Sequence, residues 1–358
     1  MGLRAVLETG RQALEQRLLQ RWFAPAGRPR DWLDRLALDP LACLVRAIAI
    51  RRRTRVSRLA PTRRPAVIVV GNLVAGGAGK TPLVIEIARA LTERGWPVGI
   101  LVRGHRAVRH EARLVAPDDD PRQQGDESVL LARETRLPVA CGVDRGQALA
   151  LLGQRHPEIG VVISDDGLQH GALPRCLELA VFDERGAGNA RLLPAGPLRE
   201  PLTHLAGMDA ALIREPAAWP AALAAVAPAL RVFRFSVRPV AFVPMSGPGA
   251  PLPVDAFRAL ASGRTVHALA GIAQPRRFFD TLRECGVHAQ TTQALSDHAP
   301  AQPGLLPAGA DLIIMTAKDA VKFAGFADPR CWYLAVRASC EPALIDWLEE
   351  SLRGPSTH

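Results

Sequence analysis

Paired cysteine motifs are missing from this chain of 358 residues. Its six cysteines are scattered, and no two of them have the C-x-x-C spacing that zinc sites and redox motifs use. This spread argues against a zinc site and against a disulfide framework, and it favours a reducing compartment. The cysteines are Cys43, Cys141, Cys176, Cys285, Cys331 and Cys340.

Long apolar runs are missing as well. No stretch reaches the roughly 18 uninterrupted apolar residues that a membrane span needs. The first residues also lack the apolar core of a secretory signal peptide, because charged residues interrupt it. These charges are Arg4, Glu8, Arg11, Glu15 and Arg17. From the two absences we expect a cytoplasmic protein.

The chain has fewer acidic than basic residues, 35 against 45. The resulting net charge of +10 favours an anionic partner. Seven arginines precede the first predicted strand, and such a cluster can contact anionic lipid headgroups, RNA or only solvent. No aromatic residues alternate with these basic ones, so we expect no nucleic-acid partner. The arginines are Arg51, Arg52, Arg53, Arg55, Arg58, Arg63 and Arg64.

Apolar stripes among arginines predict amphipathic helices in residues 1–60, with breaks at Pro25, Pro29 and Pro40. A basic segment that carries tryptophans can lie in a membrane interface. It can equally form a helix pair that packs on the following domain, and both can hold on different faces.

Strand-like and helix-like stretches alternate from residue 66 to about 213, which is typical of a mainly parallel sheet with helices on both faces. Proline and glycine accumulate in residues 244–253, and a second α/β segment follows. We therefore predict an α/β fold with four parts: basic helices (1–60), a first α/β domain (61–235), an extended linker (236–260) and a smaller α/β domain (261–358). In the first α/β segment, the expected strands are 66–70, 98–102, 138–141, 160–164, 177–182 and 209–213, and the expected helices are 81–95, 126–135 and 144–155.

The stretch 67–82 organises the chain. A β-branched apolar run ends at Gly71, a glycine-rich turn follows, and Lys80-Thr81 opens a helical pattern. In such a phosphate-binding loop, backbone N–H groups wrap a phosphate, the lysine adds positive charge and the threonine hydroxyl ligates Mg²⁺. The usual form G-x-x-x-x-G-K-[ST] has glycine where this chain has Val74. We expect nucleotide phosphates to be bound by Val74, Ala75, Gly76, Gly77, Ala78, Gly79, Lys80 and Thr81.

Carboxylates follow other predicted strands or open helices. Asp165 and Asp166 come after an apolar run, where P-loop proteins hold Mg²⁺, and the alternative is an ordinary Asp-Gly turn. Asp126 opens a predicted helix, and taken alone it is more simply an N-cap.

Three further positions are candidates. Arg103 follows a strand, at the edge where open α/β sheets bind ligands. Arg199 and Glu200 lie in a proline-framed loop that holds a charged pair in place. His298 follows Ser296-Asp297, and a lone histidine is more often structural.

Eight motifs occur together and in order. The set resembles tetraacyldisaccharide 4′-kinase, the lipid A 4′-kinase family of bacteria with outer membranes, up to about residue 325. The motifs are V-x-G-G-A-G-K-T-P (74–82), R-G-H-R (103–106), G-D-E-S (125–128), D-D-G-L-Q-H (165–170), G-N-A-R-L-L-P-A-G-P-L-R-E-P (188–201), A-G-I-A-Q-P-R-R-F (270–278), S-D-H (296–298) and T-A-K-D-A-V-K (316–322).

The resemblance implies ATP- and Mg²⁺-dependent phosphorylation of the 4′-hydroxyl of a tetraacylated disaccharide 1-phosphate, which gives lipid IV-A. It implies a peripheral enzyme at the cytoplasmic face of the inner membrane, with two α/β/α sandwich domains joined by a short β linker. The partners expected are the acylated lipid and the membrane face, and no protein partner is evident.

By matching motif, the resemblance also implies roles for single residues. Lys80 would serve the β/γ-phosphates, and Thr81 with Asp165 and Asp166 would serve Mg²⁺. Asp126 would be the catalytic base, paired with His298 across the predicted linker, so we expect cleft closure to bring the two together. Arg199 would contact the transferring phosphoryl group, with Glu200 orienting it. Substrate contacts are expected from Arg103, Glu127, Gln169 and Glu200.

The chain departs from the family pattern at His105, Gln274 and Ala299, positions expected near the acyl sugar or the adenine. The alternative function is a P-loop ATPase or GTPase switch, or a metallochaperone, that acts on a protein partner. Against it, position 75 is alanine instead of the lysine often found there, and no cysteine pair is present to hold a metal.

Overall fold

The computed structural model describes residues 17–24, 32, 34–60, 64–104, 111–246, 249–297, 299–326 and 328–354. The chain forms two compact units, each assembled from separate stretches. Unit 1 comprises Met1–Lys80, Gly160–Phe235 and Cys340–His358, and unit 2 comprises Thr81–Ile159 and Ser236–Ser339. The division expected from the sequence follows chain order, whereas these units do not.

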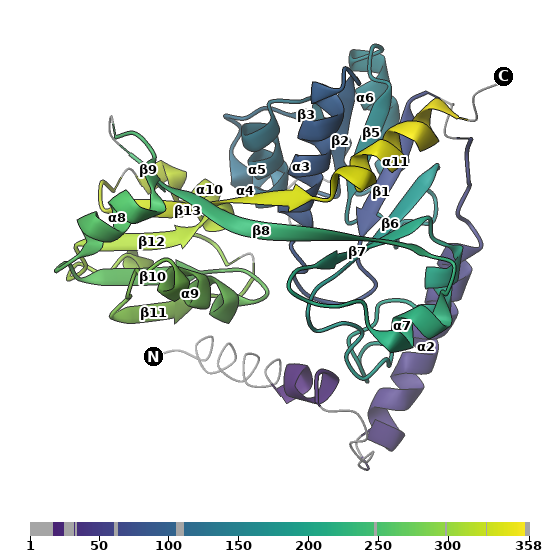
Figure 1. Cartoon of the computed structure of the whole chain (residues 1–358), viewed down its shortest axis with the longest axis horizontal. Helices are drawn as coiled ribbons and strands as arrows, with labels where there is room; N and C mark the ends of the chain where they lie inside the picture. The colour runs from purple at the N-terminus through teal and green to yellow at the C-terminus, as the bar shows by residue number, and fades with distance from the viewer. Residues whose placement is uncertain are drawn as a thin grey trace. The chain divides into compact units, whose positions relative to one another are not determined.

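Unit 1 is built on parallel strands (Figure 1). They are β1 (Ala66–Gly71), β5 (Val161–Asp165), β6 (Leu177–Phe182), β7 (Ala210–Arg214) and the first part of β8 (Arg231–Pro244). β1 lies between β5 and β6, and β7 lies between β6 and β8. Val70 of β1 pairs with Asp165 of β5, so the glycine-rich turn and the aspartates leave the sheet at the same edge. All three central strands β1, β5 and β6 are buried along their whole length; β1 is a continuous apolar run, whereas β5 and β6 also bury polar side chains.

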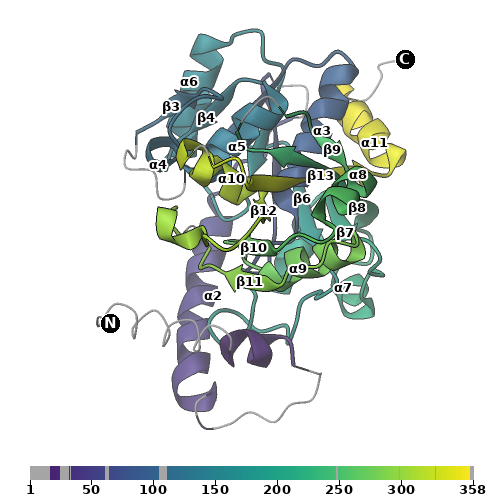
Figure 2. The same ribbon diagram turned by 90° about the vertical axis from the view of Figure 1, so that its left-hand side faces the viewer.

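One sequence-based prediction about the helices of unit 1 was wrong. Pro40 does not break a helix, because it occupies the first turn of α2, where the missing N–H is tolerated. Figure 2 shows α2 as one long helix. The helical segments are 17–22, η1 (Asp34–Leu38), α2 (Asp39–Arg53), η2 (Leu202–Gly207), α7 (Ala221–Val226) and α11 (Pro342–Arg353). In the described part of the chain, no helix is long and apolar enough to cross a bilayer.

The first part of unit 2 carries the helix that Asp126 opens. Its elements are α3 (Lys80–Glu93), which continues from unit 1, β2 (Val98–Val102), β3 (Arg113–Val115), α4 (Pro121–Gln124), α5 (Asp126–Thr135), β4 (Val139–Cys141) and α6 (Arg145–Arg155). β4 pairs with β2 in parallel and with β3 antiparallel. The six strands expected up to residue 213 are all present, and their ends agree within one residue.

The N-cap interpretation of Asp126 was wrong. Gly125 is the N-cap of α5, with φ +90° and ψ +137°, a backbone conformation that favours glycine. Asp126 is the first helical residue, and its Oδ1 accepts a hydrogen bond from the N–H of Glu127 at 3.0 Å. Asp126 therefore does not occupy the N-cap position of α5.

The second part of unit 2 is a smaller parallel sheet with helices on both faces. β10 lies between β11 and β12, and β12 pairs with β13. The elements are β9 (Leu252–Pro253), α8 (Val254–Ala261), β10 (Val266–Ala270), α9 (Pro275–Glu284), β11 (Thr291–Ala294), η3 (Pro303–Leu305), β12 (Leu312–Thr316), α10 (Ala317–Phe323), η4 (Ala324–Phe326) and β13 (Cys331–Cys340).

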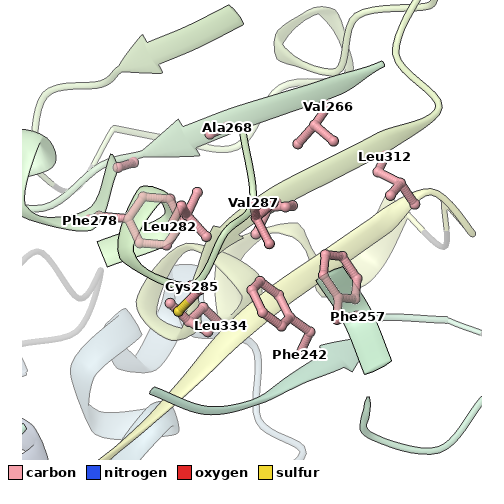
Figure 3. Packing of buried hydrophobic residues seen from close by; sticks show 12 residues of the cluster. Phe242, Phe257, Val266, Ala268, Phe278, Leu282, Cys285, Val287, Leu312 and Leu334 are labelled. Carbon is pink, nitrogen blue, oxygen red and sulfur yellow. The ribbon is translucent and has the colours of Figure 1, made fainter. Parts of the chain in front are cut away.

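Alternate residues of β12 belong to different cores. Leu312 and Ile314 pack with side chains of α8 and α9 (Figure 3), whereas Ile313 and Met315 pack with side chains of α10. This period of two is what a strand buried on both faces requires. The α/β class predicted from the sequence is confirmed.

The expected extended linker contains regular structure. Residues 236–260 hold the second part of β8, all of β9 and most of α8. Phe257 of α8 is fully buried and stacks on Phe242 of β8, with ring centroids 3.9 Å apart. Helix α8 was not predicted from the sequence, because the proline and glycine residues before it dominate the local pattern.

Truncating the Phe257 side chain tests this packing. We expect Phe257→Ala to lower the free energy of unfolding by about 3–5 kcal/mol, because the change leaves a cavity under α8. Val240→Ala, at a position on β8 that is 41% exposed, is the control and should change it by less than about 0.5 kcal/mol. Urea unfolding followed by circular dichroism measures both. Equal effects would mean that α8 is not part of the core.

Candidate functional site

The glycine-rich turn needs glycine at two positions. Gly76 has φ +103° and Gly79 has φ +80°, conformations that side chains with a Cβ rarely adopt. Val74 needs no such freedom, because it is buried and forms an antiparallel bridge with Leu198. The valine that departs from the usual motif therefore has a structural reason.

The proline-framed loop lies along this turn. The N–H of Ala75 donates to the carbonyl of Pro197, and the N–H of Arg199 donates to the carbonyl of Leu73, both at 2.7 Å. This backbone pairing brings Arg199 beside the glycine-rich turn, although more than a hundred residues separate them in sequence.

Lys80 is held between an amide and a carboxylate. Its Nζ donates to Oδ1 of Asn72 at 2.8 Å and lies 3.2 Å from a carboxylate oxygen of Asp166. The Nδ2 of Asn72 donates to the carbonyls of Val74 (2.6 Å) and Gly76 (3.0 Å), so one buried side chain ties the turn to its lysine. Asn72 was not predicted from the sequence, although a polar residue directly after a buried apolar strand is a signal that could have identified it.

Arg199 and Asp166 form an ion pair in the same place. One guanidinium nitrogen of Arg199 lies 3.0 Å and 2.9 Å from the two carboxylate oxygens of Asp166. Glu200 was expected to orient Arg199, but its carboxylate accepts from Gln169 at 2.8 Å and lies 2.9 Å from Nδ1 of His204. Its link to Arg199 runs through Gln169, whose Oε1 lies 3.4 Å from the same guanidinium nitrogen.

The residues expected to serve a metal have the right chemistry for Mg²⁺. Asp165 is 4% exposed at the carboxyl end of β5, and Thr81 lies in the first turn of α3 beside Lys80. Mg²⁺ is usually held by one or two carboxylates while keeping several waters or phosphate oxygens. Among the described residues, no three His, Cys, Asp or Glu side chains cluster in a way that could hold a metal ion.

A second charged cluster lies within unit 2, at the start of α5. Nζ of Lys318, from α10, lies 2.9 Å from a carboxylate oxygen of Glu127 and 3.0 Å from one of Asp297. Burial alone would lower the pKa of the Lys318 ammonium, but the negative charges of Glu127, Asp126 and Asp297 outweigh it and raise that pKa. Lys318 is therefore a permanent cation beside Asp126, which is 7% exposed.

Lys318 also bears on the expected pairing of Asp126 with His298. His298 and His105 lie outside the described residues. The chain neighbours of the pair, Glu127 and Asp297, are already joined through Lys318 within one compact unit. The segments that carry Glu127 and Asp297 thus lie together within unit 2.

The remaining candidate, Arg103, is exposed and directly follows β2 in unit 2. The structure thus joins Asn72, Lys80, Asp166, Gln169, Arg199 and Glu200 in one network, which we call the phosphate site. Asp126, Glu127 and Asp297 form a cluster around Lys318 within unit 2.

Comparison with known proteins gives consistent matches over most of the chain. A family model described as tetraacyldisaccharide-1-P 4′-kinase matches residues 34–353. A tetraacyldisaccharide 4′-kinase of Dechloromonas aromatica is 42% identical over 94% of this chain and 98% of its own. One of Alkalilimnicola ehrlichii is 45% identical over 91% of this chain and 94% of its own.

A solved structure is similar as well. The crystal structure of LpxK from Aquifex aeolicus in complex with ATP superposes with a TM-score of 0.71 at 25% identity, covering 87% of this chain and 98% of that one.

The role of Asn72 in holding the turn can be measured without any ligand. We expect Asn72→Ala to speed amide hydrogen exchange in residues 73–79 by about tenfold or more, because two carbonyls of the turn and Lys80 lose a buried partner. Gln154→Ala, an exposed change in α6, is the control. Unchanged exchange in the turn would show that the backbone pairing with residues 197–199 suffices.

Proposed function

The chain belongs to the tetraacyldisaccharide-1-P 4′-kinase family, and from that premise we propose that it transfers the γ-phosphoryl group of ATP to the 4′-hydroxyl of a tetraacyldisaccharide 1-phosphate. The product is lipid IV-A, an intermediate of lipid A biosynthesis. The phosphate site supports this proposal most strongly. There, the cationic side chains of Lys80 and Arg199 both pair with the carboxylate of Asp166, next to the glycine-rich turn.

The phosphate site suits phosphoryl transfer. The loose transition state of this reaction carries negative charge on the phosphoryl oxygens, so positioning and charge neutralisation supply most of the catalysis. We assign the β/γ-phosphates to Lys80 and the backbone N–H groups of residues 74–81, and the transferring group to Arg199. Mg²⁺ held through Thr81 and Asp165 would add further positive charge, with Asp166 orienting its two cationic neighbours.

We assign the acceptor side to the cluster in unit 2. Asp126 would orient the 4′-hydroxyl and take its proton as the new O–P bond forms and the bond to ADP breaks. An aspartate has an ordinary pKa of about 3.9 and is a weak base, but a loose transition state needs little early proton removal. His298 would support Asp126, and Lys318 would hold Glu127 beside it. Contacts of Arg103, Glu127, Gln169 and Glu200 with the substrate remain part of this proposal.

The alternative of a P-loop switch or metallochaperone is not supported. The family match runs from residue 34 to residue 353 and therefore includes the whole of the phosphate site and the Lys318 cluster. Relatives that span over nine-tenths of the chain carry the kinase name.

We also propose that residues 1–60 attach the enzyme to the cytoplasmic face of the inner membrane, because acyl chains keep the substrate in a bilayer. Leu41, Leu44 and Ile48 are 50%, 58% and 43% exposed, and their spacing places them on one side of α2. Basic residues in the last turn of α2 suit anionic headgroups.

Kinase activity is tested with purified protein, ATP, Mg²⁺ and the tetraacyldisaccharide 1-phosphate in detergent micelles. Wild-type protein should place phosphate on the lipid, whereas ATP hydrolysis indifferent to the lipid would favour a switch. We expect Asp126→Asn to lower kcat by about 10²–10⁴-fold with little change in the KM for ATP, since the loss concerns proton transfer. Glu134→Gln, an exposed change at the other end of α5, is the control. Near-normal turnover of Asp126→Asn would exclude it as the base.

Membrane attachment is tested by sedimentation with anionic vesicles. We expect the triple variant Leu41→Ser/Leu44→Ser/Ile48→Ser to lose most vesicle binding, because it removes the exposed apolar face of α2. Its activity on micellar substrate should persist, because these side chains are exposed and do not belong to the hydrophobic core. The change leaves Asp34 and Asp39 paired with Arg191, so α2 keeps its place on unit 1. Val240→Ser, exposed on β8, is the control. Undiminished binding of the triple variant would refute the role of this face.

A further inference from the structure

A group of ion pairs with a buried centre lies next to the turn that carries Asp166 and Gln169. It consists of Arg175, Glu178, Arg53 and Arg58, and we call it the arginine hub. The side chains of Arg175 and Glu178 are both fully buried. None of the four was expected from the sequence to act at the site, and burying so much charge is costly unless every group is paired.

Arg175 holds the turn by its backbone. Its guanidinium donates to the carbonyls of Leu168 (3.3 Å) and Leu173 (3.0 Å) and to that of His170. It also lies 3.0 Å from a carboxylate oxygen of Glu178. A guanidinium has five N–H donors in a rigid plane, so these acceptors together define the path of residues 168–173.

The same turn directs two side chains into the phosphate site. Asp166 has φ +52°, an uncommon conformation for aspartate that the following residues must hold in place. Gln169 donates to Glu200 and to the backbone carbonyl of Asn72. A shift of the turn would therefore move the partners of Lys80 and Arg199.

Glu178 connects Arg175 to α2. Its carboxylate accepts from Arg53, in the last turn of α2, at 2.6 Å and lies 3.0 Å from Arg58. Backbone hydrogen bonds also tie Arg175 to the segment that follows α2: the N–H of Arg175 donates to the carbonyl of Ser57 at 3.0 Å, and the N–H of Leu59 donates to the carbonyl of Arg175 at 2.9 Å.

Packing at the end of α2 is equally close. A Cβ on Gly171 would lie 2.2 Å from the carbonyl oxygen of Arg52, so only glycine fits where the turn meets the helix. The end of α2 and the turn thus touch directly as well as through the arginine hub.

We propose that Arg175 is a positioning residue for phosphoryl transfer, kept in place by Glu178 and by Arg53 of α2. It acts through the backbone of the turn and so sets where Asp166 and Gln169 lie in the phosphate site. Beyond any contact with the bilayer, α2 supports the catalytic geometry through Arg53. The part of this inference that concerns turnover rests on the proposed function, whereas the part that concerns the turn does not.

Arg53 is the position to test, because it lies at the edge of the hub and Arg175 itself is too buried to replace safely. Arg53→Met should lower kcat on micellar substrate by about tenfold, since misplacing a positioned group is costly in rate. It should also speed amide exchange in residues 166–171. Arg53→Lys should restore part of both, because an ammonium can still pair with Glu178.

Arg353→Met is the matched control. Arg353 also lies in the last turn of a helix of unit 1 and also pairs with a glutamate (Glu349) at 2.6 Å, but it is 69% exposed. The kcat of Arg353→Met and its rate of amide hydrogen exchange in residues 166–171 should equal those of the wild type. All rates are compared well below the unfolding midpoints, so that each variant is fully folded.

The two measurements distinguish a failure of this proposal from a failure of the proposed function. Wild-type exchange in residues 166–171 of Arg53→Met would overturn the proposal, and so would equal losses in Arg53→Met and Arg353→Met. If the wild-type protein itself placed no phosphate on the lipid, the proposed function would fail, while the exchange measurement would still decide whether the arginine hub holds the turn.

Discussion

The ammonium of Lys80 is shared between the amide oxygen of Asn72 and the carboxylate of Asp166, and the geometry of the phosphate site depends on this pairing. Asn72 ends a buried strand and also bonds to two carbonyls of the glycine-rich turn. Asp166 in turn binds Arg199. The cations that would meet a nucleotide are therefore already in place, so that little reorganisation is needed when phosphate charge arrives.

Two buried charged side chains of this protein are each surrounded by groups of the opposite charge. Lys318 is surrounded by carboxylates beside Asp126, and Glu178 by three arginines behind the phosphate site. Buried ions are tolerated only when they are paired and hydrogen-bonded. Each cluster consequently fixes the segments that contribute to it, and in both cases one of those segments carries a residue assigned to the reaction. The two clusters belong to different units.

Much of the first α/β segment could be predicted because its strands are short, apolar and β-branched, and the ends of all six agreed within one residue. The glycine-rich turn and the strand-end aspartates were found by the same local patterns. Two elements could not be predicted, for local reasons. Helix α8 follows a proline- and glycine-rich stretch, and β11 is a polar, mostly exposed strand without an apolar signal. Pro40 looked like a break because its place in the first turn of α2 depends on where the helix begins.

The sequence by itself determined the α/β class, the glycine-rich turn before Lys80 and the family resemblance, since each depends on residues that are neighbours in the chain. Only the tertiary structure decided which distant residues share a charge: Arg199 with Asp166, Glu200 with Gln169 and His204, and Lys318 with Glu127 and Asp297. It also assigned α11 to unit 1 and the start of α5 to the same unit as residue 297. The reason is physical, because an ion pair depends on distance and burial in space, and neither is encoded by spacing along the chain.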